Sequence, residues 1–112
     1  MSTALRERPE NRRYSETFSF EVSRDGVPPI AYNATVSFFA DGRVADLFIR
    51  GGKAGSDVSI STNETALAVS MALQHGTPLE TIRRAMPRTN DGRPEGAIGT
   101  LLDLLVKEGV VT

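Results

Sequence analysis

Hydrophobic and polar residues alternate in three successive segments between residues 14 and 50. This period of two is typical of a strand that buries one face. The dipeptide Asp41-Gly42 favours a tight turn between the second and third segments. We therefore expect three antiparallel strands in meander order, with one face of the sheet covered and the other wet or paired with a second subunit. The apolar positions are Phe18, Phe20 and Val22, then Tyr32, Ala34, Val36 and Phe38, then the run VADLFIR that ends at Arg50.

Beyond the strands the hydrophobic spacing becomes helical. The predicted fold class is α+β, a three-stranded antiparallel meander followed by three helices packed on one face of the sheet (βββααα). The helix signals are a capping box at Ser61 and Glu64, a C-terminal glycine at Gly76, an N-cap at Thr77 with Pro78 in the first helical position, a stop at Pro87, and a third helix from Pro94 or Glu95 to Glu108.

The first 13 residues combine arginines and glutamates and show no periodic apolar positions. We expect residues 1–13 to be a disordered N-terminal tail, and residues 14–112 to form a single α+β domain. No apolar leader and no stretch long enough to span a membrane is present. The expected location is the cytoplasm, without a membrane partner.

The composition limits the reactions and partners that we expect for this chain. Thirteen basic residues against 14 acidic ones give a formal charge of −1, which makes a nucleic-acid partner an unfavoured prediction. The chain has no cysteine and one histidine, His75. This excludes thiol chemistry and disulfides. Because the aspartates show no ligand-loop spacing, we expect no metal. We also expect no cofactor and no catalytic residue. For His75 a role at the end of the first helix is favoured over catalysis.

The segment IRGGKAGSDVSIS, residues 49–61, contains the one candidate ligand site. Its glycines could orient successive backbone amides toward one anion. The spacing is neither a Walker A motif nor GxGxxG, so a connection that binds nothing stays an alternative. The predicted phosphate or nucleotide site consists of Gly51, Gly52 and Gly55 as an amide cradle, Lys53 as countercharge, Ser56 as hydroxyl donor, and the adjacent Arg50.

The run RGGKAGS followed by ALAVSMALQHGTPLETI resembles the small TSCPD-type accessory domain of ribonucleotide reductases, especially the cobalamin-dependent type. The resemblance covers residues 44 to about 105. Reductases of that family use a thiyl radical and a reducing cysteine pair, so their catalytic role does not extend to a cysteine-free chain. The resemblance implies a non-catalytic accessory or regulatory domain. The matching residues are Gly52, Lys53, Gly55, Ser56, Ser70, Leu73, Gln74, Gly76, Pro78, Leu79 and Glu80.

Two further features leave alternatives open. The arginines of the second helix and its loop form a solvated face, or they line an anion pocket together with Arg50 and Lys53. Phe39 is a dimer contact or the end of a strand. The arginines are Arg83, Arg84, Arg88 and Arg93.

The alternative function is a structural or interaction module that forms a homodimer through its sheet and binds no ligand. A homo-oligomer or a protein partner is expected.

Overall fold

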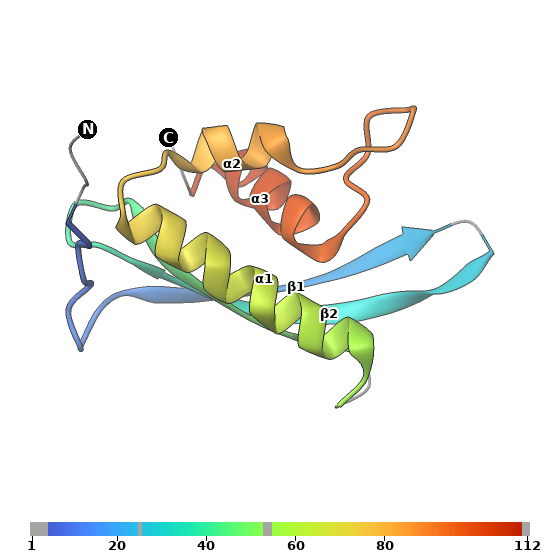
Figure 1. Cartoon of the computed structure of the whole chain (residues 1–112), viewed down its shortest axis with the longest axis horizontal. Helices are drawn as coiled ribbons and strands as arrows, with labels where there is room; N and C mark the ends of the chain where they lie inside the picture. The colour runs from blue at the N-terminus through green and yellow to red at the C-terminus, as the bar shows by residue number, and fades with distance from the viewer. Residues whose placement is uncertain (1–4, 25, 53–54, 111–112) are drawn as a thin grey trace.

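The computed structural model describes residues 5–24, 26–52 and 55–110 and confirms the predicted fold class. Three antiparallel strands form one sheet in the order β1-β2-β3, and three helices follow (Figure 1). Figure 1 shows α1 running along the sheet, with α2 and α3 on the same side of it. The elements are β1 Ser15–Arg24, β2 Val27–Phe38, β3 Val44–Gly51, α1 Asp57–Gln74, α2 Leu79–Ala85 and α3 Ala97–Lys107.

The strand register explains the alternation in the sequence. Phe18 lies opposite Ala34, which in turn lies opposite Ile49, so these side chains share the face beneath the helices. The buried core consists of this inner face together with apolar residues of α1, α2 and α3. The outer face carries mostly polar side chains, and the ring of Phe48 on it is 61% exposed. One face of the sheet is therefore covered and the other faces solvent in this chain.

The turn between β2 and β3 follows the predicted Asp41-Gly42 signal. Gly42 has φ +93°, and its N–H donates to the carbonyl of Phe39 at 2.9 Å. Phe39 is buried, and the guanidinium of Arg43 lies 4.6 Å from the centre of its ring. Since Phe39 packs within its own chain, the dimer-contact interpretation is wrong and the strand-end interpretation is confirmed.

The first helix begins earlier than predicted. Its N-cap is Ser56, whose hydroxyl accepts a hydrogen bond from the N–H of Ser59 at 3.2 Å. Ser61 lies inside the helix and its side chain is exposed, so the capping-box prediction at Ser61 and Glu64 is wrong. Both serines offer a capping hydroxyl, and the β-branched residues between them obscured the first turn in the sequence.

The other helix boundaries lie closer to their predicted positions. Pro78 is the N-cap of α2 and not its first residue, because its extended ψ of 141° places it just outside the helix. The third helix starts at Ala97 and not at Pro94 or Glu95, because Pro94 forms a β-bridge with Arg88. The C-terminal glycine of α1 is confirmed, since Gly76 has φ +94° and follows the C-cap.

Two buried polar side chains of α1 bind the outer edge of β3. The N–H of Leu47 donates to Ser70 Oγ at 2.9 Å, and the Leu47 carbonyl lies 3.3 Å from the same hydroxyl. Gln74 Nε2 donates to the carbonyl of Ala45 at 3.0 Å. Ser70 and Gln74 are 5% and 4% exposed. Helix α1 therefore satisfies backbone groups that an edge strand would otherwise leave to water.

Residues 5–13 form no helix or strand, and several of them contact the domain. Arg6 Nε donates to Gln74 Oε1 at 2.7 Å, and the N–H of Glu7 donates to the carbonyl of Gln74 at 2.7 Å. Arg13 pairs with Asp46 at 2.8 Å. The disordered tail over residues 1–13 stays a prediction. Among the described residues, no helix is long and apolar enough to cross a membrane.

We expect Ser70→Ala to destabilise the protein by about 1–3 kcal/mol, because it leaves the buried N–H of Leu47 without a partner. Ser61→Ala, an exposed serine of the same helix, is the matched control and should change stability by less than about 0.5 kcal/mol. Urea unfolding followed by circular dichroism measures both. Equal effects of the two substitutions would contradict the assigned role of Ser70.

Candidate functional site

Gly51 ends β3 directly opposite Tyr32. A Cβ atom added at Gly51 would lie 2.0 Å from Tyr32 Cδ1, far inside contact distance. The Tyr32 ring is itself stacked on Phe20, with 5.6 Å between the ring centres. Glycine is therefore required here by the packing of an aromatic ring, and its φ is not in the left-handed region.

The next two glycines have the backbone conformation that the sequence suggested. Gly52 has φ +71° and Gly55 has φ +78°, and both are exposed. A Cβ at Gly55 would meet no atom within 4 Å. Lys53, the predicted countercharge, lies outside the described residues. The described parts of the turn thus face solvent.

Ser56 and Arg50 lie on the two sides of the turn. The Ser56 hydroxyl already accepts the N–H of Ser59, and Asp57 places a carboxylate in the first turn of α1. Arg50 is exposed, with its guanidinium 5.9 Å from the centre of the Phe48 ring on the outer face of the sheet. The structure thus places Gly51 to Gly52 and Gly55 to Ser56 at the junction of β3 and α1. The ligand role of these residues and Arg50 stays a prediction.

A groove of about 940 Å³ begins beside this turn. It lies between the first half of α1, residues 21–23 of β1 with Tyr32 of β2, and residues 86–100, and it includes the start of α3. Volumes of this order are typical of small-molecule sites. Its lining mixes apolar side chains with hydroxyls, among them those of Thr62, Thr65 and Thr100. This groove was not predicted from the sequence, in which the hydroxyls at helical spacing in α1 were the available signal.

The charges of the groove are unfavourable for an anion deep inside it. Three carboxylates line it, those of Glu21, Asp57 and Glu95, against the guanidinium of Arg93. Arg93 is already paired with Asp91 at 3.0 Å. A phosphate would therefore be repelled within the groove, whereas an uncharged ring would not.

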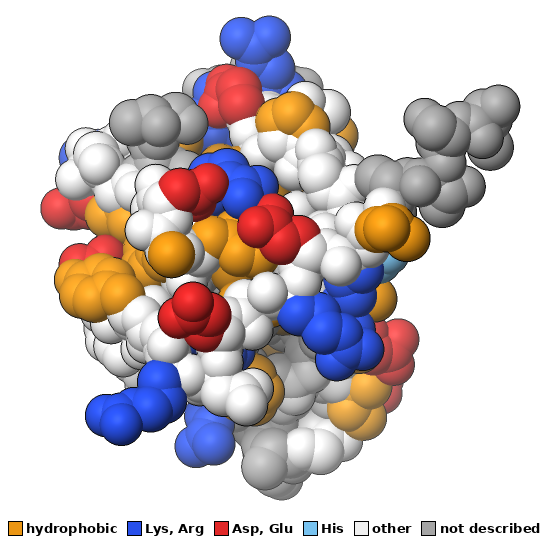
Figure 2. All heavy atoms as spheres, turned by 90° about the vertical axis from the view of Figure 1, so that its left-hand side faces the viewer, with side chains coloured by type: hydrophobic (Ala, Val, Ile, Leu, Met, Phe, Trp, Pro, Cys, Tyr) orange, Lys and Arg blue, Asp and Glu red, His pale blue; other side chains and the backbone are white. Residues whose placement is uncertain are grey.

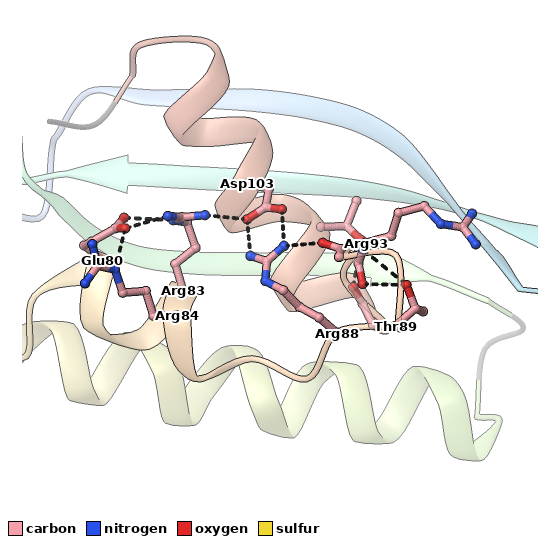
Figure 3. A network of polar contacts seen from close by, with 10 residues as sticks. Glu80, Arg83, Arg84, Arg88, Thr89, Arg93 and Asp103 are labelled. Atoms are coloured by element: carbon pink, nitrogen blue, oxygen red, sulfur yellow. Dashed lines mark hydrogen bonds and ion pairs between the residues drawn. The ribbon is translucent and has the colours of Figure 1, made fainter.

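The arginines of α2 and the following loop form ion pairs within the chain (Figure 3). Arg88 makes a bidentate contact with Asp103 of α3, at 2.7 and 2.9 Å. Arg83 contacts the same carboxylate at 3.1 Å and Glu80 at 2.5 and 2.8 Å. These contacts hold α2 and the loop on α3. The prediction that these arginines line an anion pocket is wrong for Arg83 and Arg88, whose guanidinium groups bind Asp103. Arg93 lines the groove beside the turn, and its part in such a pocket stays a prediction.

The same contacts determine the titration of the groups involved. Hydrogen bonds from Arg83 lower the pKa of Glu80 to about 2, and hydrogen bonds from Arg88 lower the pKa of Asp103. The pKa of Arg83 is raised chiefly by its hydrogen bonds to Glu80. All of these groups are charged at neutral pH, so the network carries ion pairs and not a proton-transfer pair.

The left-hand side of the molecule in Figure 1 shows no single-sign patch among its described residues. Figure 2 shows acidic and basic side chains interspersed around a small hydrophobic area. Here His75 Nδ1 lies 2.8 Å from the carbonyl of Met71, next to Gly76, as expected for a helix end. Within the described residues, no group of three or more histidines, aspartates and glutamates could hold a metal ion.

We expect Gly51→Ala to destabilise the protein by about 1–3 kcal/mol, because the new methyl group must displace the Tyr32 ring. Removing most of that ring with Tyr32→Val should abolish the penalty. A double-mutant cycle, measured by chemical unfolding, tests this. Strictly additive effects of the two substitutions would show that Gly51 is constrained by something else.

The lowered pKa of Glu80 predicts how stability changes with pH. A carboxyl group with a depressed pKa stabilises the fold above its unfolded value and loses that contribution as the pH falls through its folded value. Wild type should therefore exceed Glu80→Gln in stability at pH 7, and the difference should shrink between pH 4.5 and about 2. Thermal melts from pH 7 to pH 2 measure it. Glu64→Gln on α1 is the control, and a parallel decline there would contradict the assignment.

Comparison with known proteins identifies a family for this chain. The family model of the TSCPD domain matches residues 3–108. Comparisons with curated proteins and with solved structures found no match. The matched range includes the strands, the glycine turn, the groove and the ion-pair network described above. Because the match spans nearly the whole chain, the chain belongs to the TSCPD domain family.

Proposed function

We propose that this TSCPD domain is a non-catalytic accessory or regulatory domain related to ribonucleotide reductase, acting in the cytoplasm. The observation that carries the proposal is the family match over residues 3–108 in a chain without cysteine. Reduction of a ribose through a thiyl radical requires a thiol in the same chain or in a partner. A cysteine-free domain can contribute binding, but it cannot supply that thiol.

The ligand that we propose is a nucleotide, with its phosphates at residues 50–56 and its base and sugar in the adjoining groove. Two observations support this division. The turn combines exposed glycines with the N-terminus of an 18-residue helix, whose dipole favours negative charge. The groove has the volume of a small-molecule site but carries an excess of carboxylates, so it suits the uncharged part of the ligand.

The alternative function is a structural or interaction module that forms a homodimer through its sheet and binds no ligand. It is favoured by the structural roles found in the turn. Gly51 accommodates the Tyr32 ring, Gly52 and Gly55 supply positive φ angles, and Ser56 caps α1. These residues are therefore explained without a ligand.

We expect nucleoside diphosphates and triphosphates to raise the melting temperature of the wild type, and Lys53→Ala to abolish the shift. A ligand at ten times its dissociation constant stabilises by about 1.4 kcal/mol, which is several degrees for a domain of this size. Lys107→Ala, at the only other lysine, is the matched control and should keep the shift.

The comparison of ligands separates the two parts of the site. A nucleotide should shift the melting temperature more than inorganic phosphate, because only the nucleotide also occupies the groove. The absence of a shift for every ligand at millimolar concentration, or an equal shift in Lys53→Ala, would leave the alternative function.

A further inference from the structure

Strand β1 leaves one edge of its backbone without partners. The N–H of Phe38 donates to the carbonyl of Tyr14 at 3.0 Å, which fixes the alternation along β1. Even-numbered residues direct their backbone groups to β2, and odd-numbered residues direct theirs outward. Within the part of the chain that the structure describes, no hydrogen bond reaches the outward backbone groups of Thr17, Ser19 or Glu21.

The opposite edge of the sheet is covered by helix α1. Outward backbone groups of Ala45 and Leu47 on β3 are bound by Gln74 and Ser70 of α1, which packs along that strand. Among the described strands, this difference leaves a single free edge per chain. Pairing through it produces a closed pair and cannot propagate into a fibre.

The free edge carries little of the protection that native edge strands use. From residue 15 to residue 22 it contains no proline, lysine or arginine, and its charges are Glu16 and Glu21. Phe18 and Phe20 lie on the inner face beside this edge and are only partly buried. A strand added at this edge would cover both rings and satisfy the outward backbone groups.

We propose that β1 pairs antiparallel with β1 of a second copy, about a two-fold axis at Ser19. This inference rests on the interaction alternative of the proposed function and not on nucleotide binding. The register sets Phe18 opposite Phe20 of the other copy in both halves of the interface. Thr17 then faces Glu21, and Glu16 faces Val22, so no carboxylate lies opposite another carboxylate.

The sequence of β1 favours this register over its neighbours. Residues whose backbone groups point to the free edge must lie opposite residues of the same kind in the other copy. The two-fold axis can therefore shift along the strand by one residue at a time. With the axis at Phe18 or at Phe20, only one aromatic pair forms, against two with the axis at Ser19. With the axis at Glu21, the two Glu21 carboxylates oppose each other, which is unfavourable. The near-palindrome SETFSFEVS, residues 15–23, fits itself best about Ser19.

Sedimentation velocity of the full chain over a hundredfold range of concentration tests the proposal without any nucleotide. We expect a monomer–dimer equilibrium. Thr17→Glu should raise the dimer dissociation constant about tenfold, because each copy then sets the introduced carboxylate against Glu21 of the other, and Thr17→Lys should lower it. Thr35→Glu is the control, since Thr35 lies on the central strand in the same row and should leave the constant unchanged.

Ser19→Pro provides a second test, because it removes an outward N–H while keeping the ladder between β1 and β2. It should yield a folded monomer by circular dichroism. A wild type that is monomeric at the highest concentration, assemblies larger than two chains, or a dimer that Thr17→Glu and Thr17→Lys affect alike would overturn the proposal. Each of these results concerns association alone and leaves nucleotide binding to its own test.

Discussion

The structure depends on the contact between helix α1 and the edge of β3. Ser70 and Gln74 are buried polar side chains, and each binds a backbone group that faces away from the sheet. An unpartnered buried polar group costs about 1–3 kcal/mol, so the two sides of this contact require each other. The apolar side chains around them provide most of the burial. The polar pair fixes where along β3 the helix lies.

This placement of α1 determines the form of the glycine turn. The chain leaves β3 at Gly51 and must enter a helix already at Asp57, while the ring of Tyr32 lies against the end of the strand. Glycine at 51 accommodates the ring, and positive φ angles at Gly52 and Gly55 reverse the chain. The residues that resemble a ligand loop are thus also those that the connection requires. A ligand role would use exposed amides that the fold has already positioned.

Much of the fold follows from local sequence signals. Alternation predicted the strands, Asp41-Gly42 predicted the tight turn, and Gly76 predicted the end of the first helix, because each depends on residues close together in the chain. The position of the first N-cap did not follow, because Ser56 and Ser61 offer the same hydroxyl and only the tertiary position of α1 selects between them.

Long-range pairings were beyond what the sequence could show. Asp103 lies 15 residues from Arg88 and 20 from Arg83, and no spacing rule connects them. The sequence therefore leaves an anion pocket open for these arginines, although the acid that neutralises Arg83 and Arg88 belongs to another helix. Likewise the family resemblance identified Ser70 and Gln74 without indicating that both bind the edge of β3. Composition excluded thiol chemistry, but the groove depends on tertiary packing.

The two edges of the sheet differ for a physical reason that bears on function. Helix α1 covers β3, whereas α3, which contacts β1, makes no hydrogen bond to the outward backbone groups of Thr17, Ser19 or Glu21 among the described residues. The glycine turn follows β3, and the free edge belongs to β1, with β2 between them. Pairing of β1 with a second copy and ligand binding at the turn would therefore use different strands. A domain of this family could combine both without competition for the same backbone groups.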